Sequence, residues 1–102
     1  MFFSVSIFLR SSQPVGDEVL LEETIRLVEA QSYEDAISAA ELLAKSLEIS
    51  YRNALGSSTA WTVEEIEEPQ EIVDSLSHGA ELCSRTLTLS EREALKRKHP
   101  NT

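Results

Sequence analysis

The chain has few of the residues that build the commonest kinds of functional site. It contains one cysteine, Cys83, in 102 residues, so it can form no intramolecular disulfide and no cysteine-rich metal site. A small secreted domain held together by disulfides is therefore excluded. Basic residues are also scarce, with 9 Lys and Arg against 18 Asp and Glu, and the net charge is −9 at pH 7. With three glycines and three prolines, the chain has no low-complexity tract or long linker.

The negative charge is concentrated in the body of the chain. Up to Leu89 there are 5 basic and 16 acidic residues, a net charge of −11, whereas the residues from Ser90 onward have 4 basic and 2 acidic residues, a net charge of +2. Such a body repels the phosphates of nucleic acids and the surface of anionic membranes. We therefore expect neither as a partner. The basic tail is expected to complement the acidic body of its own chain or of a neighbouring subunit.

Long hydrophobic runs are missing as well, and none approaches the length of a membrane span. Residues 2–9 are apolar but alternate with Ser4 and Ser6, which is typical of a strand and not of a signal peptide. We expect a soluble cytoplasmic protein. The length predicts a single domain, with a compact body of about residues 2–89 and a short basic helical tail of about residues 90–99.

The hydrophobic pattern predicts the elements of this domain. After the first strand, residues 19–30 predict a second, with Leu21, Ile25 and Leu27 on one face and Glu22, Thr24 and Arg26 on the other. Ser32 fits the N-cap of a helix whose apolar residues recur at three- and four-residue steps as far as Leu47, with fraying around residues 49–55. Three further strands are predicted at residues 59–68, 70–76 and 81–89, and a capping box at Ser90–Glu93 opens a short helix to about Lys98.

These segments predict an α+β fold with a mainly antiparallel sheet of four to five strands. Their order along the chain is β-β-α-β-β-β, with one long helix packed across one face and a short C-terminal helix. Pro69 has no N–H to donate to a sheet ladder and therefore marks a corner or an edge. The first strand has apolar residues on both faces and is expected to be central.

No constellation of residues predicts catalysis. Cys83 and His78 lie five positions apart across a predicted turn, where side chains seldom meet, and a thiol in a strand usually serves as a small buried apolar group. His78 and Glu81 would supply two ligands to a metal, fewer than zinc needs. We expect a protein without enzymatic activity, with no catalytic residue, no metal site and no cofactor.

One acidic stretch stands out as a candidate for partner binding. Its carboxylates are Glu64, Glu65, Glu67, Glu68, Glu71 and Asp74, with no basic residue among them. In a regular strand Glu65 and Glu67 would compete with Val63 and Ile66 for the buried face. The pattern therefore predicts a bulge or a twist between Glu64 and Glu68 that turns most of these carboxylates outward. We interpret the stretch as a surface for a basic protein partner, in the manner of an inhibitor or immunity protein.

Two other functions stay open. The first is a small-ligand or enzymatic domain with a pocket between sheet and helix, for which Tyr33, Trp61 and Arg85 are the candidate walls. The second is a structural domain that forms a homodimer. For Trp61 the commoner role is that of a core anchor, and for Arg85 that of a partner in a surface charge pair.

The sequence also resembles a known family. The segment Val28–Ile37 (VEAQSYEDAI), Ala40, Trp61 and the segment His78–Arg85 (HGAELCSR) look like a small bacterial domain family, numbered 4288 among the domains of unknown function. The resemblance runs from about Phe3 to Leu89. Because that family has no established activity, the resemblance supports the architecture and implies no catalytic residue.

Overall fold

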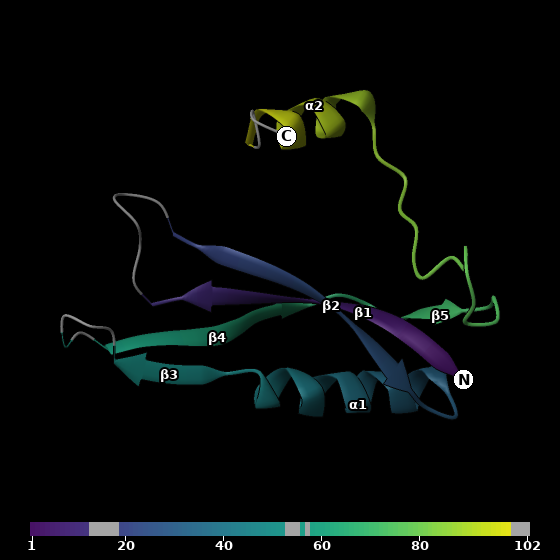
Figure 1. Ribbon diagram of the computed structural model, residues 1–102, viewed down its shortest axis with the longest axis horizontal. Helices are drawn as coiled ribbons and strands as arrows, with labels where there is room; N and C mark the ends of the chain where they lie inside the picture. The colour runs from purple at the N-terminus through teal and green to yellow at the C-terminus, as the bar shows by residue number, and fades with distance from the viewer. Residues whose placement is uncertain (13–18, 53–55, 57, 99–102) are drawn as a thin grey trace.

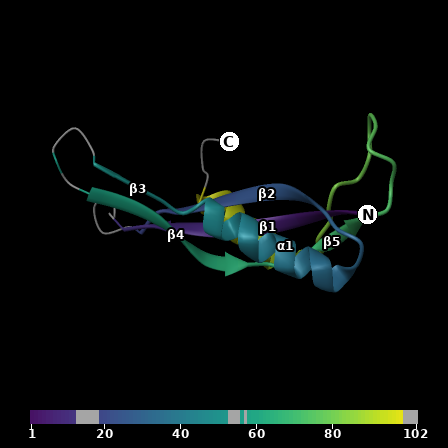
Figure 2. The same cartoon turned by 90° about the horizontal axis from the view of Figure 1, so that it is seen from below.

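The computed structural model describes residues 1–12, 19–52, 56 and 58–98. These residues form a five-stranded antiparallel sheet and two helices, which confirms the predicted α+β class. One helix packs along one face of the sheet, and the second stands over the opposite face (Figure 1). In the view turned by 90°, the first helix lies in front of the sheet and the second lies behind it (Figure 2). We call the sheet face turned away from the first helix the open face.

The elements follow one another as five strands interrupted by one helix and followed by another. They are β1 (Phe2–Ser11), β2 (Leu21–Glu29), α1 (Tyr33–Ser46), β3 (Ile49–Arg52), β4 (Ser58–Ile66), β5 (Gln70–Ile72) and α2 (Leu89–Lys98). The strand order is β2-β1-β4-β3, and β5 pairs with β1 beside β4. As predicted, β1 is central: β2 occupies one of its edges, and β4 and β5 share the other.

The hydrophobic core lies between α1 and the sheet. Phe3, Val5 and Ile7 of β1 are buried there, and the alanines of α1 that face them are fully buried at Ala36 and Ala40. Small side chains on the helix let its backbone approach the sheet closely. Ser32 caps α1 as predicted, because its Oγ accepts a hydrogen bond of 3.1 Å from the Asp35 backbone N–H.

The pairing register decides which face of β2 is covered by α1. Phe3 pairs with Val28, Val5 with Arg26 and Ile7 with Thr24, and paired residues point to the same face. The side of β2 that carries Thr24, Arg26 and Val28 therefore faces α1. The other side of β2 lies on the open face and carries Leu21, Ile25 and Leu27. These three residues are 53%, 53% and 52% exposed, respectively.

The predicted elements differ from the structure in four places. The first helix has 14 residues and ends at Ser46, so it is not long. Ile49–Arg52, predicted as fraying helix, forms β3 because Ile49 and Tyr51 alternate with polar residues and pair with β4; residues 53–55 of that prediction lie outside the described part. Residues 81–88 form no strand, and the predicted strand at 70–76 is β5, which ends at Ile72.

The short second helix begins earlier than predicted. The Thr88 Oγ1 accepts a hydrogen bond of 3.2 Å from the Glu91 N–H, and the Glu91 Oε1 accepts one of 3.2 Å from the Thr88 N–H. This is a capping box, two residues before the predicted Ser90–Glu93. The hydrogen bonds from Thr88 lower the pKa of Glu91, and the nearby charge of Arg85 acts in the same direction. In the described ranges, neither helix combines the length and the apolarity that crossing a membrane requires.

Candidate functional site

The predicted bulge in the acidic strand is present. Phe8 pairs with Glu65 and Leu9 pairs with Val63, so Glu64 is an extra residue on β4 with no counterpart on β1. The bulge lets Val63 and Ile66 both pack against the core on the α1 side, while the glutamates between them stay exposed. Two consecutive glutamates are thereby accommodated between two core residues.

The rest of the acidic stretch is distributed over several environments. Glu64 forms an ion pair with Arg10, whose Nε donates to the Glu64 Oε1 at 2.9 Å. Asp74 Oδ2 accepts a hydrogen bond of 3.1 Å from the Glu81 N–H. Glu65 lies opposite Phe8 on the open face, whereas Glu71 lies opposite Phe3 on the α1 side of β5. The six predicted partner-binding carboxylates therefore do not form one continuous surface.

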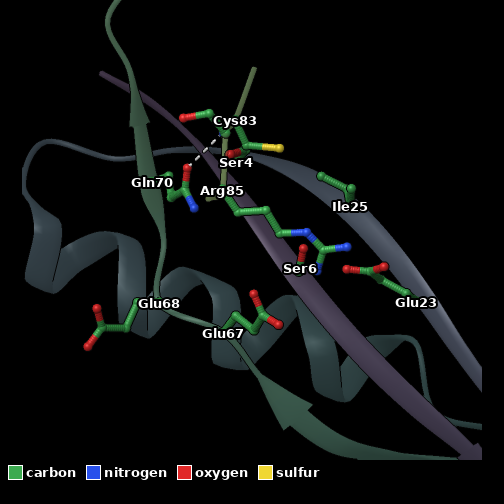
Figure 3. A pocket seen from close by; sticks show the side chains of 10 residues that line it. Ser4, Ser6, Glu23, Ile25, Glu67, Glu68, Gln70, Cys83 and Arg85 are labelled. Atoms are coloured by element: carbon green, nitrogen blue, oxygen red, sulfur yellow. Dashed lines mark hydrogen bonds between the residues drawn. The ribbon is translucent and has the colours of Figure 1, made fainter. Parts of the chain in front are cut away.

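Glu67 and Glu68, which follow β4, border a pocket on the open face. The pocket has a volume of about 240 Å³. It is lined by Ser4 and Ser6 of β1, Glu23 and Ile25 of β2, Glu67, Glu68 and Gln70 around the start of β5, and Cys83, Ser84 and Arg85 of the segment that follows. We call it the open-face pocket. Figure 3 shows Arg85 extending across it, with Ser6 beneath the guanidinium and Glu23 and Glu67 on either side.

Two side chains hold the segment 83–85 over the sheet. The Gln70 Oε1 of β5 accepts a hydrogen bond of 3.3 Å from the Ser84 N–H (Figure 3). The contact between Asp74 and Glu81 fixes the turn that precedes it. Gly79 in this turn has a φ of +85°, a conformation that side chains other than glycine rarely adopt. The polypeptide thus returns across the open face without pairing to it as a strand.

The charges of the open-face pocket are unequal. Three carboxylates, those of Glu23, Glu67 and Glu68, border it together with one guanidinium, that of Arg85. The pocket therefore has a net negative charge, and its floor adds the hydroxyls of Ser4 and Ser6 as neutral donors and acceptors. Such a lining can accept an ammonium or guanidinium group, with the carboxylates as acceptors.

The candidate walls of the alternative pocket lie on different sides of the sheet. Tyr33 lines a second hollow of about 190 Å³ between the start of α1 and Pro69, with Glu67 and Glu68 at its rim. Trp61 packs against the hydrophobic core on the α1 side. Arg85 is on the open face. In the described structure these three side chains line no common cavity.

Cys83 and His78 are both exposed, and Cys83 lies in the open-face pocket. The expectation of a thiol buried in a strand is therefore wrong, because residues 81–88 are irregular. No three His, Cys, Asp or Glu side chains of the described residues gather closely enough to hold a metal ion.

The open face itself is what reasoning from the sequence missed. The sequence places Leu21, Ile25 and Leu27 on one face of a strand, but nothing in it indicates that this face is turned away from α1. A signal was available in β1. From Phe3 to Leu9 its odd-numbered positions are all large and apolar, whereas its even-numbered positions include Ser4 and Ser6. A helix covers the more apolar face of the central strand. The pairing register of β2 with β1 then decides which side of β2 lies under that helix.

A family model covers most of this fold. It is described as "Domain of unknown function (DUF4288)" and matches residues 2–84. The match begins with β1 and ends within the segment that lines the open-face pocket, whereas α2 lies beyond it. No curated protein and no solved structure matches the chain. The chain therefore belongs to the family of domains of unknown function numbered DUF4288.

Proposed function

We propose that this domain is a protein-interaction module that binds a basic segment of another protein on its open face. The observation that carries the proposal is the row formed by Leu21, Ile25 and Leu27, each about half exposed, beside a net negative pocket. An antiparallel sheet that faces water on one side usually presents polar side chains there. Contiguous exposed apolar side chains with a polar rim are typical of interaction sites.

The charge of the domain supports a basic partner. The chain has a net charge of −9, and on the open face the carboxylates of Glu23, Glu65 and Glu67 outnumber the guanidinium groups. A segment that alternates aliphatic and basic side chains would place its aliphatic side chains on the row of Leu21, Ile25 and Leu27 and one basic side chain in the open-face pocket. Complementary charge would also speed the encounter and make binding sensitive to salt.

A basic peptide serves as the first probe. We expect a synthetic peptide of alternating Lys and Leu to bind, and to shift the amide resonances of Ser6, Ile25 and Gln70 more than those of α1. An acidic peptide of alternating Glu and Leu should not bind. If both peptides bind equally, or if the shifts concentrate on α1, the open face is not the contact surface.

Paired variants separate a local effect from a general one. Glu23→Gln with Glu67→Gln removes two carboxylates of the open-face pocket, and Glu34→Gln with Glu41→Gln removes two from the exposed side of α1. The net charge changes equally in both. We expect the first pair to weaken peptide binding by about three- to tenfold more than the second, as for a few partly exposed charge contacts. Equal weakening would contradict the proposal.

A second function is favoured by the convergence of polar groups in the open-face pocket. Hydroxyls, an amide, carboxylates and a guanidinium meet there, as they do in sites for small polar molecules. Its volume of about 240 Å³ is suited to a ligand the size of a single amino acid. A rise in melting temperature with free arginine or agmatine, lost in Glu23→Gln, would favour this alternative over a macromolecular partner.

A further inference from the structure

Strand β2 presents a long edge that no other strand of the described structure covers. It lies at one end of the strand order, and over its nine residues it pairs only with β1 within the described part of the chain. An edge of this length is a template for another strand, and proteins usually shorten or block such edges. The opposite edge of the sheet is formed by β3, which has only four residues. One edge of the sheet is therefore short, whereas the β2 edge is long enough to pair with another strand.

The sequence of β2 is complementary to itself in one antiparallel register. When two copies of β2 are aligned in opposite directions about Thr24, Glu22 of each copy lies opposite Arg26 of the other. In the same register Leu21 of each lies opposite Leu27 of the other. The symmetric pair thus contains two contacts between opposite charges and two between leucines, and directly opposite pairs are the contacts that stabilise a sheet.

Other registers that keep the same geometry lose this match. Alignment about Glu23 or about Arg26 places that residue opposite its own copy, so like charges face each other. Alignment about Ile25 places each β2 glutamate opposite an aliphatic residue. A flipped antiparallel pairing, with the helices on opposite faces, does not compete, because it would require the edge of β2 that is already bonded to β1. The register about Thr24 is the one that pairs Glu22 with Arg26 and Leu21 with Leu27, and it leaves Glu23 opposite Ile25.

The surroundings of β2 leave its charges available for such a contact. Within the described structure neither Glu22 nor Arg26 has an ion-pair partner, and both are exposed. The Arg26 Nε donates a hydrogen bond of 2.9 Å to the Thr24 Oγ1. The guanidinium therefore lies along its own strand, beside the residue that would be on the symmetry axis, and would exchange this hydrogen bond for Glu22 of a second copy directly opposite Arg26.

We propose that two copies of this chain pair through β2, antiparallel and in register about Thr24, to form one continuous sheet. The symmetry axis is normal to the sheet, so both copies of α1 lie on the same side. Both open faces then lie on the other side, where two Leu21–Leu27 pairs flank two pairs of Glu23 and Ile25. The pairing is independent of what binds the open face, and a failure of either proposal leaves the other intact.

Charge exchange between two variants tests the register. Glu22→Arg alone places Arg opposite Arg26, and Arg26→Glu alone places Glu opposite Glu22, twice in each dimer. We expect either variant to raise the dimer dissociation constant at least about tenfold in analytical ultracentrifugation. Mixing the two variants restores both opposite-charge contacts, and so does the double exchange in one chain. A misfolded variant could not be rescued by mixing, so recovery of the dimer separates pairing from folding.

A cysteine on the proposed axis provides an independent measurement. In a Cys83→Ser background, Thr24→Cys places the two thiols directly opposite each other, at a spacing that disulfides can bridge. Ile25→Cys serves as the control, because residue 25 lies opposite Glu23 of the second copy. We expect mild oxidation to crosslink the first variant and not the second. A chain that is monomeric at all concentrations, a dimer indifferent to the charge variants, or equal crosslinking at both positions would overturn the proposal.

Discussion

Two overlapping tetrapeptides at the start of α2 fit the capping-box pattern, and the choice between them shows what single residues decide. Thr88–Glu91 carries the reciprocal hydrogen bonds, whereas Ser90–Glu93 was predicted from the same pattern. The sequence contains both Ser/Thr-x-x-Glu matches, so pattern alone could not separate them. What differs is the start of the helix: the Arg92 N–H donates to the Thr88 carbonyl at 3.1 Å, which fixes Thr88 as the cap.

The same cap makes the start of α2 sensitive to pH. The hydrogen bonds from Thr88 hold the pKa of Glu91 below its ordinary value of 4.5. A carboxylate with a depressed pKa stabilises the folded helix end above 4.5, and this stabilisation is lost as the pH falls through the lowered value. We expect hydrogen exchange at the Glu91 and Arg92 amides, relative to their intrinsic rates, to accelerate in that acidic range.

The control for this prediction is a neighbouring glutamate. Glu91→Gln should abolish the acceleration, because its side chain no longer titrates, whereas Glu93→Gln should retain it. If wild type and Glu91→Gln respond alike to acid, the cap does not set the stability of this helix end.

At the scale of elements, α1 meets the sheet through alanines, and this seam leaves no room for larger side chains. Ala36 and Ala40 have no exposed surface, and Ala44 has 1%. Ala40→Leu should therefore cost about 1–3 kcal/mol of unfolding free energy, because the added atoms force the helix away from β1. Urea denaturation measures the change. Ser38→Leu, on the exposed side of the same helix, should stay within about 0.5 kcal/mol.

The elements differ in how far their sequences determine them. The helix α1 and strand β1 follow from their own periodicity, because each buries one continuous face. Residues 81–88 form no strand, and their pattern is weak, because Leu82 would lie on one face of a strand and Cys83 and Leu87 on the other. Ile49–Arg52, by contrast, alternates and pairs with the edge of β4 directly beyond the helix.

For the whole molecule, which face stays open is a consequence of register, and register depends on contacts that no local pattern encodes. The side of β2 with Leu21, Ile25 and Leu27 is more apolar than the side with Thr24 and Arg26, yet the latter faces α1. The four buried apolar residues of β1 outweigh those of β2 and dictate which side of the hairpin is covered. The open-face pocket depends in addition on a non-strand segment, so its lining could not be predicted.

The charge of the whole chain gives a prediction that involves no single site. A net charge of −9 opposes the compact state through repulsion, and salt screens that repulsion. We expect the melting temperature to rise by about 4–8 °C from low to physiological salt, which corresponds to roughly 1 kcal/mol in a domain of this size. Chloride salts should suffice, so a response seen only with sulfate would reflect salting-out instead. A melting temperature that is independent of salt would contradict the prediction.

The central position of β1 has a consequence for the time course of folding. Its pairing with β2 closes across a short connection, whereas Phe2 must find Ile72, and Arg10 must find Glu64, 54 positions along the chain. Closing the longer loops costs more chain entropy before any contact repays it. We therefore expect the β1–β2 hairpin to form first, while the edge of β1 that β4 and β5 will occupy is still unpaired. The rate at which β4 pairs with β1 then governs how long the nascent sheet is exposed to other chains.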